Sequence, residues 1–324
     1  AGLERLCTSE SYGPLKPGLL ESWEISDDAK TYTLFVRKGV TWNNGTAFTA
    51  EDVARNIHCW CDRDMAGNSM AGRFATLIDP NTNQALEGAI EVVDDHTVRL
   101  NLPKPDISLI PGMADYPAAI VPDGFDAAKM LENPIGTGPY LPESLLPGEK
   151  GVLVRNANHS WWNAGNGAWL DRIEFLDFGT DPAAWARAAQ DGDIDMTYSV
   201  DGEYADLIGS FGGWTKHEVI SMATVVVRPN QTAEVGGIKP YADARVRQAI
   251  MKAVDNGILL ELGNDGRGEV AQNHHIGPAH PEYADIGGPD YDPEGARDMV
   301  KGEGPGGFEG ENATNQEPRG QTPP

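Results

Sequence analysis

The stretch PGLLESWEISDDAKTYTLFVRKGVTWNNGTAFTAEDVARNI, residues 17–57, carries the signals of a strand hairpin, a tight turn and a helix in succession. Residues 23–26 and 31–37 predict two strands, joined by a turn at residues 27–30. In the second strand, Tyr32, Leu34 and Val36 alternate with Thr31, Thr33 and Phe35. One face of this predicted hairpin is therefore more apolar than the other and is expected to face a core.

The end of the same stretch predicts a helix. Residues 43–45, Asn-Asn-Gly, give a strong turn signal. Thr49 follows as a candidate N-cap, and Asp52 stands three residues later, close to the spacing of a capping box. The apolar side chains that recur at helical spacing and predict a buried face are Val53, Ile57 and Trp60.

Further along, predicted strands and helices follow one another. A second hairpin is expected at residues 90–102, and Asp181 with Pro182 favours a helix start as N-cap and first helical residue. Asp243 is expected to cap an amphipathic helix, whose stripe consists of Val246, Ala249, Ile250, Ala253 and Val254. The remaining predicted strands cover residues 172–178, 194–198 and 218–227.

The length and composition indicate a loop-rich α/β or α+β protein. The chain has 324 residues, enough for two domains with a third possible, and is 40% hydrophobic. Its 38 glycines and 23 prolines imply many turns. No apolar run approaches the ~20 residues of a membrane helix, which predicts a soluble chain. Residues 301–324 are rich in Gly, Pro and Glu and are expected to be disordered.

The charge and the first residues bear on location and partners. The formal net charge is −24, which disfavours nucleic acid and anionic lipid as partners and favours a soluble monomer. It suits an extracellular, periplasmic or saline setting. The chain begins without the basic and apolar regions of a signal peptide, so either none was present or the numbering starts after its removal.

The three cysteines, Cys7, Cys59 and Cys61, are too few for a disulfide scaffold. Cys59 and Cys61 are two positions apart on the predicted helix, and this spacing points them to different faces. A shared metal ion is therefore disfavoured. The expected role is that of small buried or half-buried thiols.

The glycine-containing loop NPIGTGPY, residues 133–140, raises the question of phosphate binding. A Walker loop requires Gly-x4-Gly-Lys-Ser/Thr running into a helix, but Gly138 is followed by Pro139 and Tyr140. The third glycine of a dinucleotide fingerprint is replaced by Leu141. We therefore predict a turn that redirects the chain between two structured regions.

Several segments in one order resemble the solute-binding proteins of peptide-type ABC importers, the extracytoplasmic dipeptide, oligopeptide and nickel-binding family (family 5). The opening stretch, residues 17–57, looks like the signature segment of this family, and NPIGTGPY resembles its Pro-Val-Gly-Thr-Gly-Pro-Tyr turn. Similar segments follow at residues 153–162, 170–196 and 239–260. The resemblance covers roughly residues 17–300. Each of the five motifs is weakly specific, but together, in the right order, they are strong evidence for the family.

The resemblance implies an α/β periplasmic-binding-protein fold of the class II type, with two lobes hinged around a cleft and lobe one split into two subdomains. The small subdomain is then expected at residues 1–135, the main subdomain and hinge at 136–230, and the start of lobe two at 231–300. Compared with the family, the segment before Pro17 is short or missing. Much of lobe two is also absent, so an incomplete second lobe is expected.

Proteins of this family do no chemistry, so the resemblance implies a binding protein, not an enzyme, with no cofactor and no metal of its own. It implies a periplasmic monomer that captures a peptide or other small solute between its lobes and delivers it to the permease subunits of an ABC importer. By position in the matching motifs, we expect ligand contacts in three places. These are Asn68, Ser69 and Met70 at the lip of the small subdomain, Tyr198 and Ser199 at a strand end, and Ser221, Thr224 and Arg228 along the strand toward the hinge.

Three rival interpretations remain open. A zinc-dependent hydrolase would use His274, His275 and His280, although no His-Glu-x-x-His motif accompanies them. A carbohydrate platform would use Trp161, Trp162 and Trp169, although such a cluster is more often packing between subdomains. A chaperone or sensor partner with the same fold is the third alternative.

Overall fold

The computed structural model describes residues 2–9, 15–200, 202–219, 224–274, 276–278, 283–288 and 290–301. Two compact units follow one another along the chain, Ala1–Arg187 and Ala188–Pro324, and each is described by itself. Of the tail predicted to be disordered, residues 301–324, Lys301 is the last residue of a helix and residues 302–324 lie outside the described residues. The subdomain boundaries expected near residues 135 and 230 stay a prediction.

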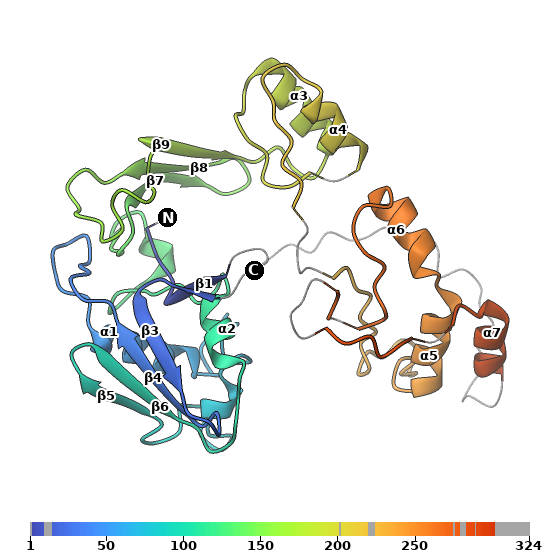
Figure 1. Ribbon diagram of the computed structural model, residues 1–324, viewed down its shortest axis with the longest axis horizontal. Coiled ribbons are helices and arrows are strands. Elements are labelled where there is room, and N and C mark those ends of the chain that lie inside the picture. The colour runs from blue at the N-terminus through green and yellow to red at the C-terminus, as the bar shows by residue number, and fades with distance from the viewer. Residues whose placement is uncertain are drawn as a thin grey trace. The chain divides into compact units, whose positions relative to one another are not determined.

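A four-stranded antiparallel sheet is the largest sheet of the first unit (Figure 1). Its order is β3 (Leu20–Ile25), β4 (Thr31–Val36), β6 (Thr97–Asn101) and β5 (Ile90–Asp94). Both predicted hairpins are confirmed by this order. The predicted alternation in β4 is also confirmed, because Tyr32, Leu34 and Val36 are buried while the residues between them are half-buried.

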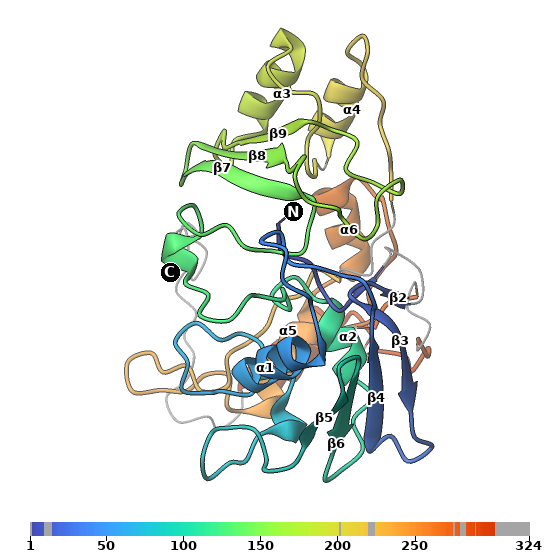
Figure 2. The ribbon, with the colours of Figure 1, turned by 90° about the vertical axis from the view of Figure 1, so that its left-hand side faces the viewer.

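Helix α1 (Ala50–Trp60) lies against β5 and β6 (Figure 2). The predicted cap is confirmed, since Thr49 is the N-cap and pairs with Asp52 in a capping box. Val53, Ile57 and Trp60 are buried, as their spacing predicted. The helix therefore closes one side of the core, which sits between α1 and the sheet.

Segments for which the sequence predicted no strand or helix complete this core. Strands β1 (Cys7–Ser9) and β2 (Leu15–Pro17) pair with each other, and α2 (Leu109–Ala114) contacts both. Two short 3-10 turns, η1 (Ala75–Leu77) and η2 (Ala127–Lys129), lie in the connections.

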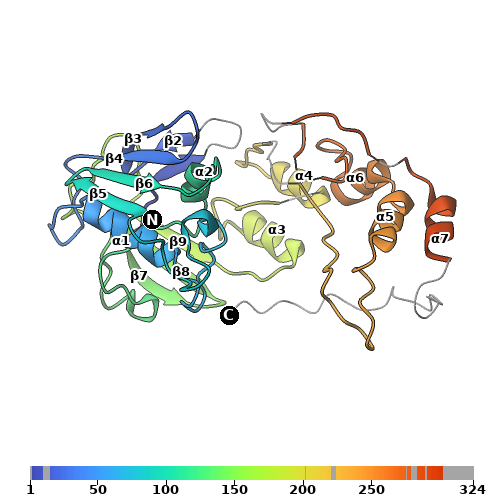
Figure 3. The ribbon, with the colours of Figure 1, turned by 90° about the horizontal axis from the view of Figure 1, so that it is seen from below.

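A separate three-stranded antiparallel sheet also belongs to the first unit (Figure 3). It contains β7 (Tyr140–Leu146), β8 (Lys150–Arg155) and β9 (Arg172–Leu176) in that order. The strand predicted at 172–178 is therefore confirmed as far as Leu176. Helix α3 (Pro182–Asp191) follows β9 and begins at Pro182, as the Asp-Pro pair predicted.

Four helices lie entirely within the second unit as the structure describes it, and segments without regular structure separate most of them. They are α4 (Glu203–Gly209), α5 (Ala244–Ala253), α6 (Asn256–Asn264) and α7 (Pro293–Lys301). Helices α5 and α7 pack together, burying Ala249 and Ala296. The predicted cap is confirmed, because the Asp243 carboxylate accepts from the backbone N–H of Arg245 at 2.8 Å.

Two strand predictions are wrong for the residues that the structure describes. Residues 194–198 have no regular structure, and neither have the described residues of 218–227, namely 218–219 and 224–227. A strand requires a neighbour for its backbone N–H and C=O groups, and these segments have no ladder partner among the described residues. Their apolar side chains are correspondingly open to solvent, with Val225 97% exposed.

Candidate functional site

The glycine loop, residues 133–140, is contacted through its backbone by three other segments of the chain. Its backbone is held from three sides: Asn43 N donates to Gly136 O at 2.9 Å, Gly138 N donates to Gly2 O at 3.0 Å, and His159 Nε2 lies 2.9 Å from Thr137 O. Gly136, Thr137 and Gly138 are all buried. These contacts are internal, which agrees with the prediction of a turn rather than an anion cradle.

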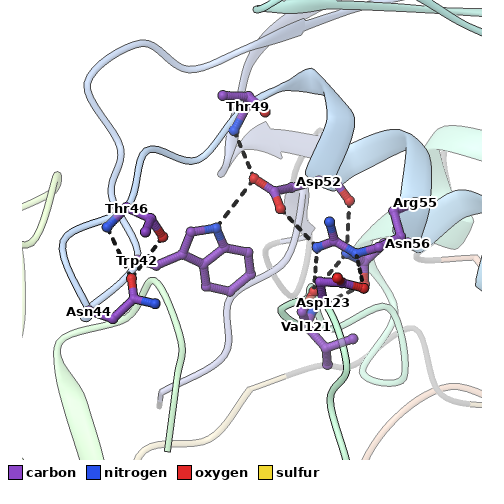
Figure 4. A network of polar contacts seen from close by, with 9 residues as sticks. All are labelled: Trp42, Asn44, Thr46, Thr49, Asp52, Arg55, Asn56, Val121 and Asp123. Atoms are coloured by element: carbon purple, nitrogen blue, oxygen red, sulfur yellow. Dashed lines mark hydrogen bonds and ion pairs between the residues drawn. The ribbon is translucent and has the colours of Figure 1, made fainter.

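The signature segment of the sequence forms a polar network around the start of α1 (Figure 4). The Asp52 carboxylate accepts from Thr49 N at 3.0 Å, from Trp42 Nε1 at 3.3 Å and from Arg55 Nη2 at 2.8 Å. One turn later, the buried Asn56 amide exchanges hydrogen bonds with Val121, donating to its oxygen at 2.9 Å and accepting from its nitrogen at 3.0 Å. These residues fix the helix and its neighbouring loop, so their role is structural.

The predicted lip residues follow α1. The Asn68 side-chain amide donates to the oxygens of Cys59 at 3.0 Å and Asp62 at 2.6 Å, which closes the C-terminal end of the helix. Its Oδ1 accepts from the N–H of Met70 at 3.0 Å. Met70 itself is 2% exposed and belongs to the core, whereas Ser69 is exposed. Of the three, only Ser69 presents a side chain to solvent that is not already used in packing or capping.

The predicted residues of the second unit lie in segments without regular structure. Tyr198 is fully exposed at 102%, and Ser199 is exposed beside it. Thr224 is half-buried, Arg228 is exposed, and Ser221 lies outside the described residues. The Arg228 guanidinium makes no ion pair with any residue that the structure describes. Their part in ligand binding stays a prediction.

An open groove of about 720 Å³ lies at one end of the four-stranded sheet. The side chains that line it are Glu21, Ser22, Phe35, Val36, Lys38, Asp94, Asp95, His96 and Thr97. None of the residues predicted to bind ligand is among them. Hydrogen bonds from the His96 backbone and the Thr97 side chain lower the pKa of Asp94, so this carboxylate is ionised at neutral pH.

The cysteines are buried or half-buried thiols, as the sequence predicted. Burial raises the pKa of Cys7 to about 12 and the pKa of Cys61 to about 12. Both thiols are buried, Cys59 is half-buried, and none of the three is in a disulfide. Low-pKa thiolates are the reactive form, so Cys7 and Cys61 are poor nucleophiles and poor metal ligands.

The rival metal site receives no support from the described residues. No group of three or more His, Cys, Asp or Glu side chains in that part of the chain is placed to hold an ion. His274 stacks on Tyr283 with ring centroids 6.3 Å apart, while His275 and His280 lie outside the described residues. A hydrolase built on these three histidines has no second observation in its favour.

The three tryptophans considered as a carbohydrate platform differ in burial and in hydrogen bonding. Trp161 and Trp162 are half-buried, and both indole N–H groups donate to the carboxylate of Glu4. Trp169 is 70% exposed and is free of that contact. Glu4 was missed in the sequence, since a single carboxylate near the start of a chain carries no local pattern.

Three comparisons with known proteins identify the family. The model of the bacterial extracellular solute-binding proteins, family 5, matches residues 14–316. Di/tripeptide-binding protein 1 of Pseudomonas aeruginosa is 27% identical over 305 residues, 88% of this chain and 54% of the relative. The dipeptide-binding protein of Escherichia coli is 27% identical over 308 residues, again covering 88% and 54%. The chain therefore spans about half the length of the curated relatives it matches.

Solved structures give the same result for the fold. NikZ of Campylobacter jejuni in complex with Ni(L-His) matches with a TM-score of 0.70 at 22% identity, over 92% of this chain and 57% of that one. The oligopeptide-binding protein AppA of Bacillus subtilis, in complex with a nonapeptide, matches with a TM-score of 0.66 at 21% identity, with coverages of 92% and 57%. The predicted α/β periplasmic-binding-protein fold is confirmed, and the covered share agrees with a second lobe represented only in part.

These proteins are named as binders of solutes, and the prediction that the chain is not an enzyme is confirmed by its family. No helix among the described residues combines the length and apolar character needed to cross a bilayer. The segments that carried the resemblance, from residue 17 to about residue 300, fall inside the matched range 14–316. The chain belongs to the bacterial extracellular solute-binding proteins, family 5.

Proposed function

We propose that this protein captures a peptide or other small solute outside the cytoplasm, as a monomer, and delivers it to the permease subunits of an ABC importer. The observation that carries the proposal is the family match over residues 14–316, together with relatives named for dipeptides and tripeptides. Other relatives are named for nickel and heme, so the experiment below is designed to determine the class of solute.

Capture by such a protein is a shift between conformations. A ligand that contacts two lobes at once binds the closed arrangement more tightly than the open one, and only this difference in affinity moves the population. The closed form is then the form that the permease recognises. No bond of the solute is made or broken, in keeping with a family of binding proteins.

Within this chain, the residue best suited to recognise a charged ligand group is Arg228. Its guanidinium is exposed and forms no ion pair with a described residue, so its donors remain available to a carboxylate. Tyr198 offers a fully exposed aromatic ring for apolar contact. Ser69, Ser199, Ser221 and Thr224 are the further hydroxyl-bearing candidates.

The test is a thermal-shift screen of the purified protein at its natural length. Its panel contains dipeptides, tripeptides, longer peptides, amino-acid conjugates, oligosaccharides, and nickel with and without histidine. A ligand that binds only the native state at 100 times its Kd adds about 2.7 kcal/mol to the free energy of unfolding. We expect one solute class to raise Tm in a saturable manner.

Isothermal titration with the best solute then gives the stoichiometry, for which we expect one ligand per chain. Peptides with a blocked C-terminal carboxylate are the matched control for the role of Arg228. A protein whose Tm responds to no member of the panel, or whose zinc-dependent hydrolysis of a peptide is abolished by His275→Ala, contradicts the proposal.

A further inference from the structure

The contact between Glu4 and the two tryptophans is unlike an ordinary surface hydrogen bond. Glu4 Oε1 accepts from Trp161 Nε1 at 3.0 Å and from Trp162 Nε1 at 3.2 Å, and Oε2 accepts from Trp162 Nε1 at 3.1 Å. An indole N–H can only donate, and an ionised carboxylate can only accept. The two donors therefore converge on a group of matching chemistry, in a half-buried position where water competes less than at the surface.

The two indoles are held in place independently of Glu4. Their rings meet edge to face, with centroids 6.1 Å apart. A β-carbon on Gly167 would lie 3.2 Å from the Trp161 ring, so this ring rests directly on the glycine backbone. The two donors are thus positioned by their own surroundings, which reduces the entropy lost when an acceptor binds.

A positive charge lies beside the same pair. The Arg37 guanidinium carbon is 4.3 Å from the centroid of the Trp162 ring, in cation–π geometry. Arg37 is fixed there, because its Nε donates to Gly18 O at 2.9 Å and its Nη2 to Leu20 O at 3.3 Å. Its field favours an anion at the indole N–H groups over a neutral acceptor.

The backbone of Glu4 and of the two residues after it accepts hydrogen bonds from the loop that follows α2 and from the segment that enters β3. Ile120 N donates to Glu4 O at 2.8 Å, Leu19 N to Arg5 O at 3.1 Å, and Leu20 N to Leu6 O at 2.9 Å. Trp161 and Trp162, in contrast, stand in the connection between β8 and β9. Glu4 therefore connects the segment that enters the four-stranded sheet with the β8–β9 connection of the three-stranded sheet.

We propose that Trp161 and Trp162 form a carboxylate-binding site, that Glu4 fills it as an intramolecular ligand, and that this contact holds the three-stranded sheet against the four-stranded one. The site is independent of the solute proposed above and serves the rigidity of the first unit. When the Glu4 side chain is removed, the same site takes a small free carboxylate such as acetate or propionate.

The test uses Glu4→Ala in the full chain, followed by thermal unfolding and tryptophan fluorescence. We expect Tm to fall by about 3–6 °C. Sodium acetate or propionate is then expected to raise the Tm of Glu4→Ala more than that of the wild type, at an ionic strength matched with sodium chloride. Glu24→Ala is the matched control, because Glu24 is an exposed carboxylate on β3.

A second pair of variants separates this site from a general loss of packing. Trp161→Phe with Trp162→Phe keeps aromatic rings but removes both N–H donors, so adding Glu4→Ala to it should lower Tm no further. If Glu4→Ala does not fold, Glu4→Gln with Glu24→Gln as its control measures the loss of Tm alone, because the amide side chain still fills the site and leaves no room for a free carboxylate. A Glu4 variant as stable as its Glu24 control overturns the proposal, and so does the absence of a carboxylate-specific rise in the Tm of a folded Glu4→Ala.

Discussion

The carbonyl oxygen of Gly2 lies 2.0 Å from the position that a β-carbon on Gly136 would occupy. Any side chain at position 136 must therefore displace the N-terminal segment or the loop. This displacement would also break the hydrogen bond from Gly138 N to the same oxygen, which is 3.0 Å long. The glycine of the NPIGTGPY loop is thus required by close backbone approach, and not by phosphate binding.

We predict that Gly136→Ala lowers the free energy of unfolding by about 2–4 kcal/mol. The matched control is Gly72→Ala, because a β-carbon on Gly72 meets nothing within 4 Å. Chemical denaturation of both variants checks the difference. Equal stability of the two would show that the N-terminal segment moves aside without cost.

Asp52 is predicted to stabilise the start of α1 through three partners, the N–H of Thr49, the indole of Trp42 and the guanidinium of Arg55. Asp52→Ala removes all three acceptor contacts and should cost about 1–2 kcal/mol of unfolding free energy. Glu51→Ala is the control, since Glu51 lies in the same turn but is exposed. Its cost should be about 0.5 kcal/mol or less. Denaturant titration distinguishes the two, and an equal loss in both would assign the effect to helix charge alone.

How much the sequence predicted depended on the range of the interactions involved. The Thr49–Asp52 cap and the alternation in β4 are local, so neighbouring residues alone determine them and both were predicted correctly. The segments 194–198 and 224–227 have strand-like composition, but a strand also depends on a distant partner, which composition does not contain.

The candidate site shows the same division. Motif position placed Asn68 and Met70 at a ligand-binding lip, whereas their side chains cap α1 and fill the core. The position of a residue in a motif does not separate a folding role from a binding role. Glu4 lies 157 residues from Trp161 along the chain, and no local sequence pattern predicts their contact.

The thiols provide a prediction on pH. Burial raises the pKa of Cys7 and of Cys61 from 9.0 to about 12, so both remain neutral thiols in the folded protein at pH values where the unfolded chain has already ionised them. Their contribution to stability is complete below pH 9 and is lost between pH 9 and 12, because the unfolded state ionises first. We expect alkaline unfolding in this range.

The same thiols should react slowly with a small disulfide reagent at pH 8 in the native state. The half-buried Cys59 should react first, so Cys59→Ser is expected to remove the fast phase. Unfolding in denaturant should expose all three thiols. Fast native reaction of the Cys59→Ser variant would contradict the burial of the other two.

The last prediction concerns the charge available to a ligand. If Arg228 meets a carboxylate of the solute, Arg228→Gln should weaken binding about 10–100-fold, because a hydrogen bond to a charged partner is worth roughly 1.5–3 kcal/mol. The Tm of the free protein should stay unchanged, since Arg228 is exposed and makes no ion pair with a described residue. Arg297→Gln is the matched control, an exposed arginine on α7 of the same unit. Isothermal titration with the solute found in the thermal-shift screen gives Kd for each variant. A solute with a blocked carboxylate should bind wild type and Arg228→Gln equally, and an unchanged Kd for the unblocked solute would remove Arg228 from the binding site.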